Sequence, residues 1–168
     1  MAEELIDYVE RLHAVVDELV APLLERHRGR LACRLGCTGC CGDDLTVFEV
    51  EAELIRRHHG EVLASAPAPR GRCAFLDAHG ACRIYPNRPY VCRTQGLPLR
   101  WLEEIAGEIV EQRDICPLNE AGEPVEALPV EDCWALGPVE HRLATIQERL
   151  DGGQGRRVAL RDLFDRES

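Results

Sequence analysis

Nine cysteines stand out in a chain of 168 residues, and four of them fall within the single short run CRLGCTGCC. These four are Cys33, Cys37, Cys40 and Cys41. Thiolates are ligands of zinc and of the iron in iron–sulfur clusters. A loop this short can bring several thiolates to one inorganic centre without long-range folding. The run therefore predicts metal ligation.

Five further cysteines follow: Cys73, Cys82, Cys92, Cys116 and Cys133. In a reducing compartment so many cysteines indicate metal ligation, and an odd count fits a disulfide framework poorly. Cys133 lies beside Trp134 in an apolar patch, which favours a thiol of the core. The other eight suit two four-thiolate centres, or one cluster plus a structural ion. Neighbouring Cys40 and Cys41 leave successive Cα atoms in different directions, so we predict two centres or one polynuclear centre.

Charge and composition exclude several classes of protein. The net charge is -10 and the basic residues are scattered, which argues against a nucleic-acid or anionic-membrane partner. All basic residues are Arg, so Schiff-base chemistry and a Walker phosphate loop are excluded. Serine occurs only at Ser65 and Ser168, which argues against a serine hydrolase. The acidic start MAEELIDYVERLH resembles neither an export signal nor a membrane span, so we expect a cytoplasmic protein without membrane contact.

Hydrophobic spacing predicts the elements that must position these thiols. Leu5, Val9, Leu12, Val16, Leu19 and Leu23 predict a helix over about 3–28, kinked or divided at Pro22. Further expected elements are a helix over 47–59 opened by a Thr46/Glu49 capping box, a hairpin over 73–82, a helical turn over 90–94, a helix from Pro138 to Leu150 and a short helix over 158–164. The spacing of apolar residues over 97–110 does not distinguish a helix from a strand.

These elements predict a mainly α fold with a small β-hairpin. We expect one domain over 1–168, in which amphipathic helices flank an irregular, cysteine-rich metal-binding centre. The N-terminal helix would occupy 1–30, the metal-binding core 31–118 and the C-terminal helices 119–168.

The order of the cysteine elements resembles a known family. The run with CxxCC at its end, then Cys73-Ala-Phe-Leu, then Cys82-Arg-Ile-Tyr-Pro-Asn-Arg-Pro-Tyr-Val-Cys92-Arg, is similar to the YkgJ-type cysteine-cluster family, described as a zinc- or iron-chelating domain. The resemblance covers about 33–116, and Cys116 matches a further cysteine downstream. The family also includes a flagellin lysine methylase, in which a similar cluster accompanies methyl transfer.

The resemblance extends to two arginines beside the thiols. Arg88 and Arg93 match the R-P and C-R positions of the family. A guanidinium there would bond to cluster or thiolate sulfur, tune a potential, or hold an anionic ligand. The alternative is structural pairing with one of the many acidic side chains.

The metal and its use remain open between several readings. Cys33-x3-Cys37-x2-Cys40 also has the spacing of radical S-adenosylmethionine enzymes, but Gly39 replaces the usual aromatic and Cys41 follows at once. The sequence lacks two clean CxxC knuckles, and Cys116-Pro117 is similar to the end of bacterial ferredoxin runs, which favours iron. We therefore expect an iron–sulfur protein with a redox, electron-transfer or modification-supporting role and an unidentified redox or protein partner.

Two alternatives are kept beside this expectation. One is a zinc-stapled binding module that acts through its helical surface, and the other is a metal chaperone or thiol buffer. Whether the protein is an enzyme is left open by the sequence.

Overall fold

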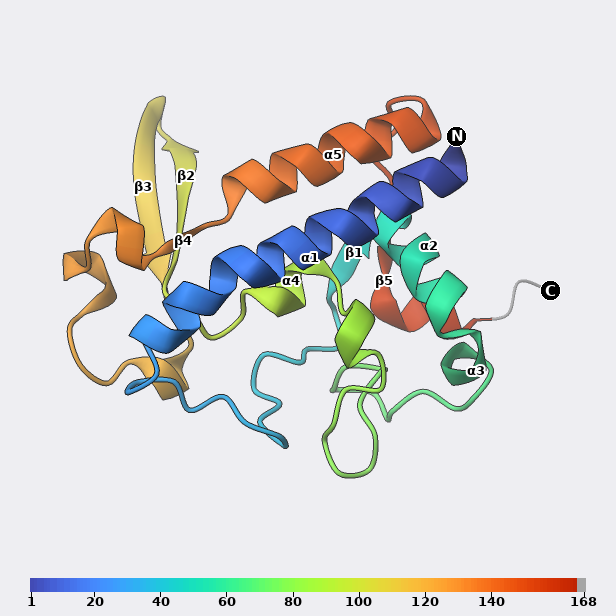
Figure 1. Ribbon diagram of the computed structural model, residues 1–168, viewed down its shortest axis with the longest axis horizontal. Coiled ribbons are helices and arrows are strands. Elements are labelled where there is room, and N and C mark those ends of the chain that lie inside the picture. Colours follow the sequence, from blue (N-terminus) through green and yellow to red (C-terminus); the bar gives the residue numbers. More distant parts are fainter. Residues whose placement is uncertain (166–168) are drawn as a thin grey trace.

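The computed structural model describes residues 1–165, in which two long helices lie side by side, a strand hairpin stands next to one end of them, and irregular loops lie below (Figure 1). The helices are α1 (Ala2–Arg26), α2 (Glu49–His58), α3 (Gly60–Leu63), α4 (Tyr90–Arg93) and α5 (Gly137–Asp151). The strands are β1 (Thr46–Phe48), β2 (Leu99–Ile105), β3 (Glu108–Asp114), β4 (Trp134–Ala135) and β5 (Arg157–Ala159). Short 3-10 turns cover Tyr85–Asn87, Pro117–Asn119, Val125–Ala127, Val130–Asp132 and Leu160–Phe164. The helices agree with the expected class, while the strands add two small sheets. The last three residues of the predicted range 119–168 lie outside the described residues.

Helix α1 confirms the long N-terminal helix predicted from the apolar stripe. Its buried side chains are Ile6, Val9, Leu12, His13, Val16 and Val20. Leu19, which shares the helical spacing, is 58% exposed and does not join the buried face. The helix also runs undivided past Pro22. Pro22 lies on the solvent side, where water can satisfy the carbonyl that loses its helical hydrogen bond.

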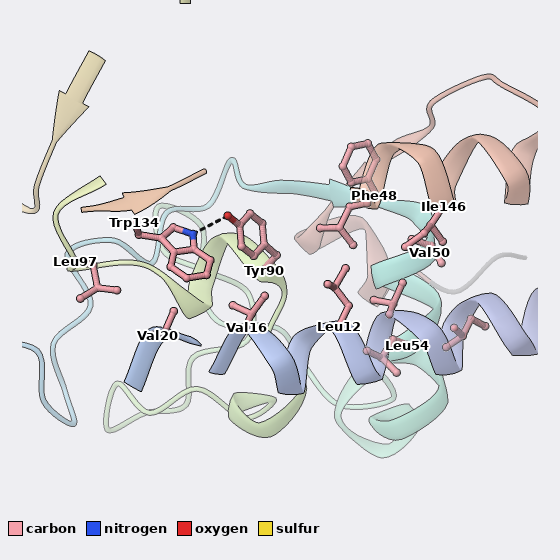
Figure 2. Packing of buried hydrophobic residues seen from close by; sticks show 13 residues of the cluster. Leu12, Val16, Val20, Phe48, Val50, Leu54, Tyr90, Leu97, Trp134 and Ile146 are labelled. Atoms are coloured by element: carbon pink, nitrogen blue, oxygen red, sulfur yellow. Dashed lines mark hydrogen bonds between the residues drawn. The ribbon is translucent and has the colours of Figure 1, made fainter. Parts of the chain in front are cut away.

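The main apolar core lies between α1, α2 and α5 (Figure 2). Leu12 of α1 lies toward Leu54 of α2, Val16 lies beneath Tyr90 of α4, and Ile146 of α5 lies beside Val50 in the same cluster. At the other end of this core, the indole Nε1–H of Trp134 donates a hydrogen bond to the hydroxyl of Tyr90 at 2.8 Å. This bond ties β4 to α4, the short helix that carries Cys92.

The start of α2 differs from the predicted capping box. Thr46 belongs to β1 and pairs with Ala159, and the N-cap is Phe48 without a side-chain bond. A side chain of α5 caps the helix instead, because Gln147 Oε1 accepts a hydrogen bond from the N–H of Val50 at 2.8 Å. Tertiary pairing therefore overrides the local capping pattern.

Two sheets bring distant segments together. Strands β1 and β5 pair antiparallel, so the segment after the first cysteine run is held by residues 157–159. The second sheet has the order β3-β2-β4, with β2 antiparallel to β3 and parallel to β4. The ambiguous segment 97–110 is thus mostly a hairpin that turns at Ala106 and Gly107, whose φ values are +53° and +85°. In the described chain, no helix is both long and apolar enough to cross a bilayer.

The cysteine-bearing loops are less regular than predicted. The hairpin expected over 73–82 reduces to one bridge between Leu76 and Cys82, closed by the N–H of Asp77 on the carbonyl of Ala81 at 2.9 Å. The helix expected over 158–164 is strand β5 followed by a 3-10 turn. A second apolar cluster, which includes Phe75, fills the space between these loops and α2.

Candidate metal centre

Five cysteines gather where the first cysteine run meets the loops over 73–92. We call Cys40, Cys41, Cys73, Cys82 and Cys92 the five-thiol group. The N–H of Cys73 donates to the carbonyl of Cys41 at 2.8 Å, which joins the two loops directly. The bridge between Leu76 and Cys82 then holds Cys82 in the same loop as Cys73.

Helix α4 brings Cys92 to this group. Its first N–H, that of Tyr90, donates to the carboxylate Oε1 of Glu51 at 2.8 Å. The same oxygen lies 3.0 Å from Nε2 of His13, and both side chains are almost fully buried. Glu51 of α2 thus holds α4 against α1 and fixes the helix that carries Cys92.

Backbone amides and burial set the electrostatics of the group. Burial raises the pKa of Cys73 and of Cys82, although Cys73 accepts a hydrogen bond from the N–H of Phe75 and Cys82 one from that of Ile84. Burial, together with the negative charge of neighbouring thiolates, raises the pKa of Cys92 to about 12. Ionisation of one of these thiols therefore opposes ionisation of the others, and a bound cation would relieve this repulsion.

Cys40 and Cys41 are closer to each other than predicted. Their thiols are hydrogen-bonded, which lowers the pKa of Cys40 to about 6 and raises the pKa of Cys41. The expectation that adjacent side chains point apart is therefore wrong here. A turn that bonds the N–H of Cys41 to the carbonyl of Thr38 at 3.0 Å brings both sulfur atoms to the same side.

Cys33 and Cys116 lie at a second place, where the chain leaves α1. Nδ2 of Asn119 is 3.5 Å from Sγ of Cys33, and the N–H of Asn119 donates to the carbonyl of Cys116 at 2.7 Å. Figure 1 shows the segment after α1 beside the orange segment after β3 before it runs toward the green loops. Cys37 lies between the two places, in a turn closed by its N–H on the carbonyl of Arg34 at 2.9 Å.

Arg88 and Arg93 both reach Asp17 on α1. Arg93 is nearly buried and donates to Asp17 at 2.5 Å and to the carbonyl of Pro86 at 3.0 Å. Arg88 lies 3.5 Å from Asp17 and stacks 4.2 Å from the ring centroid of Tyr85. The charge of Arg88 also acts on Cys82, where it partly offsets the burial that raises the pKa of this thiol. The two arginines thus join α1 to the segment between Cys82 and Cys92.

Cys133 stands apart from both places. It is buried with Ile115, Val125 and Leu128, and Nη1 of Arg113 lies 4.0 Å from its sulfur. This environment agrees with its interpretation as a core thiol.

The chemistry of the donor set fits a thiophilic metal, because nearly all of the candidate ligands are cysteine thiols. Within residues 1–165, no three His, Cys, Asp or Glu side chains are close enough to hold a metal ion as placed. All nine cysteines are free thiols, and Cys33 and Cys40 are exposed. Soft sulfur donors at this density suit zinc or iron better than any hard cation.

Sequence reasoning did not identify three residues that hold these thiols in place. Glu51 comes from α2, Asp17 from α1 and Asn119 from a loop. Each bonds a segment that carries cysteines, and each is distant in the sequence from the residue that it bonds. Only their contacts, and for Glu51 and Asn119 their burial, distinguish them from the many other acidic and amide side chains.

The comparison with known families agrees with this chemistry. Residues 32–117, just over half of the chain, match the family model CxxCxxCC, described as a "putative zinc- or iron-chelating domain". This match confirms the resemblance to a cysteine-cluster family. No curated protein and no solved structure matches the chain significantly.

Proposed function

The chain belongs to the CxxCxxCC family, and from this premise we propose that it binds iron as an iron–sulfur cluster through cysteine thiolates. The proposed ligands are the five-thiol group together with Cys33, Cys37 and Cys116. The observation that carries the proposal is that five cysteines from three separate segments lie near enough to act on one another electrostatically. Several cysteines whose ionised forms would repel one another gain nothing from proximity unless a cation joins them.

Iron is supported over zinc by the number and arrangement of the thiols. A structural zinc site is a closed tetrahedron of four ligands, whereas this group has five sulfur atoms and two of them are adjacent in sequence. Backbone N–H groups of Phe75 and Ile84 donate to sulfur, as is typical around iron–sulfur clusters. A bound cluster would supply one-electron chemistry.

We propose a redox, electron-transfer or modification-supporting role on the basis of access. Cys33 and Cys40 are exposed, so a partner or small molecule can approach the thiols from outside. Arg88 adds a positive charge beside Cys82, which would favour the more negative state of the centre. Thiol ligands stay available only where disulfides do not form, so the proposal places the protein in the cytoplasm.

The test is elemental analysis of anaerobically purified protein for iron, zinc and acid-labile sulfide, paired with an absorption spectrum. We expect iron with sulfide and a visible thiolate-to-iron absorption that bleaches in air. The variant Cys92→Ser should lose most of the iron, whereas the matched control Cys133→Ser should retain it. Colourless protein with stoichiometric zinc and no sulfide would overturn the proposal.

A second candidate function is a zinc-stapled binding module, and one observation favours it. Tyr8, Val15 and Leu19 lie on one outer face of α1 and are 37%, 47% and 58% exposed. Such a stripe suits contact with a partner helix. If the protein holds only zinc, Leu19→Glu should abolish partner binding in a pull-down while leaving the zinc content unchanged; a loss of zinc would instead show that this face is structural.

A further inference from the structure

Asn119 is fully buried, and every polar group of its side chain is used. Oδ1 accepts the N–H of Ala32 at 2.7 Å. Nδ2 donates to the carbonyl of Gly96 at 2.8 Å and to Sγ of Cys33 at 3.5 Å. The amide orientation is fixed by its neighbours, because the Ala32 N–H needs an acceptor and the Gly96 carbonyl needs a donor.

The backbone of Asn119 adds two further links. Its N–H donates to the carbonyl of Cys116 at 2.7 Å, and its carbonyl accepts from Nε of Arg30 at 2.9 Å. One residue thus joins the segment before Cys33, the turn after Cys116 and the chain just beyond α4.

Gly96 supplies the space that this arrangement needs. A Cβ at this position would lie 2.5 Å from Sγ of Cys33 and 3.2 Å from Nδ2 of Asn119. Its φ of +93° also belongs to the left-handed region that glycine adopts without strain. The Cys33 sulfur is therefore seated in a cradle made of Gly96 and Asn119.

We infer that Asn119 is a positioning residue that pairs Cys33 with Cys116 and so divides the thiols into two sets. The Cys33–Cys116 pair belongs to one set, and the five-thiol group is the other. This inference rests on the proposed function, because it states how the metal ligands are grouped. The side-chain N–H on the Cys33 sulfur would also tune a metal bound there, as amide donors to sulfur do.

The first experiment needs no metal. Metal-free protein is treated with a limiting amount of dibromobimane, which bridges two neighbouring thiols, and the linked peptides are mapped by mass spectrometry. We expect a Cys33–Cys116 link and separate links within the five-thiol group. Asn119→Asp keeps the acceptor for Ala32 but removes the donor to Cys33 and Gly96, so it should lose only the Cys33–Cys116 link. Asn87→Asp, at the one other asparagine, is the matched control and should lose neither.

The second experiment uses metal-loaded protein. Asn119→Asp should leave Cys33 and Cys116 open to alkylation, lower metal affinity at that set by about 10- to 100-fold and shift its sulfur-to-metal absorption, while the five-thiol group stays protected. Gly96→Ala should expose Cys33 in the same way although Asn119 remains, which tests the cradle if Asn119→Asp does not fold.

Two outcomes would overturn the inference: unchanged linking and protection in both variants, or wild-type protein in which Cys33 links only to the five-thiol group. Wild-type protein that binds no metal but still gives the Cys33–Cys116 link would instead refute the proposed function alone.

Discussion

The five-thiol group and the Cys33–Cys116 pair offer the same ligand atom but are anchored by different means. Cys73 and Cys82 sit against the apolar cluster of Phe75, Leu76 and Ile84, and their sulfur atoms accept backbone N–H groups. Cys33 is exposed, and a side-chain amide holds its sulfur. Burial anchors Cys73, Cys82 and Cys92 of the first set but raises the pKa of these thiols, whereas one replaceable residue anchors the second set.

Because the anchors differ, a substitution should be able to disrupt the arrangement of one set of thiols without disrupting the other. A backbone donor survives most side-chain substitutions, so with its cysteines intact the five-thiol group is best disturbed through its packing or through the helix that carries Cys92. The pair can be broken by changing a single amide. The predictions below are ordered from the largest expected effect on stability to the smallest.

Phe75→Ala should disrupt the apolar packing that supports the five-thiol group. The ring is fully buried and lies 4.9 Å from that of Phe164, so its removal should lower the free energy of unfolding by about 3–5 kcal/mol. The metal of the five-thiol group should be lost with it, as followed by denaturant titration and metal analysis. The folded fraction should still give the Cys33–Cys116 link; loss of both together would show that the two sets share one anchor.

Glu51→Ala should loosen the five-thiol group from the side of α4. The buried carboxylate bonds the N–H of Tyr90 and lies against His13, so its loss should lower the free energy of unfolding by about 3 kcal/mol. Glu51→Gln keeps an acceptor and should lose only about 1 kcal/mol. Thermal unfolding of both variants checks the order, and equal losses would contradict a capping role for the carboxylate.

Arg93→Gln separates fold from ligand binding. The guanidinium is nearly buried on Asp17 and the Pro86 carbonyl, so we expect a loss of about 2 kcal/mol from chemical denaturation. Because these contacts tie α4 to α1 and do not involve sulfur, metal content per folded chain should not change. A fall in metal content at full folding would show that Arg93 serves the centre directly, as the resemblance implies.

Arg88→Gln should weaken metal binding while having the smallest effect on stability of the four substitutions. Its pairing with Asp17 is long, at 3.5 Å, and Asp17 is 43% exposed, so we expect a loss of about 0.5 kcal/mol. The positive charge beside Cys82 is removed, however, and the metal of the five-thiol group should bind less tightly. Competition with a chelator measures this change, and Arg88→Lys should restore part of the affinity. An unchanged affinity would confine Arg88 to its contacts with Tyr85 and Asp17.

The sequence allowed the long helices and the cysteine-cluster family to be predicted because both depend on local pattern. Val9, Leu12 and Val16 recur at helical spacing, and α1 follows from them. Pro138 and the left-handed Gly152 bound α5 as expected. The CxxCxxCC match likewise depends only on the order of residues along the chain.

The remaining features depend on partners that are distant in sequence. Thr46 has the spacing of a capping residue, yet its pairing with Ala159 makes it a strand. The hairpin of β2 and β3 was obscured because much of both its faces is exposed, so apolar and acidic side chains do not alternate cleanly there. Asn119 and Glu51 have no local pattern at all, because only the folded chain brings sulfur or α4 within their reach.

The pairing of β1 with β5 has a consequence for the order of events during protein synthesis. Thr46 is held by Arg157, which lies 111 residues later in the chain, and Asp43 is paired with Arg161. The cysteine run therefore leaves the ribosome long before its downstream end is fastened. We expect the nascent chain to present an open thiol loop until residue 161 has emerged, so that metal delivered before that moment meets a flexible loop, and metal delivered afterwards meets a closed one.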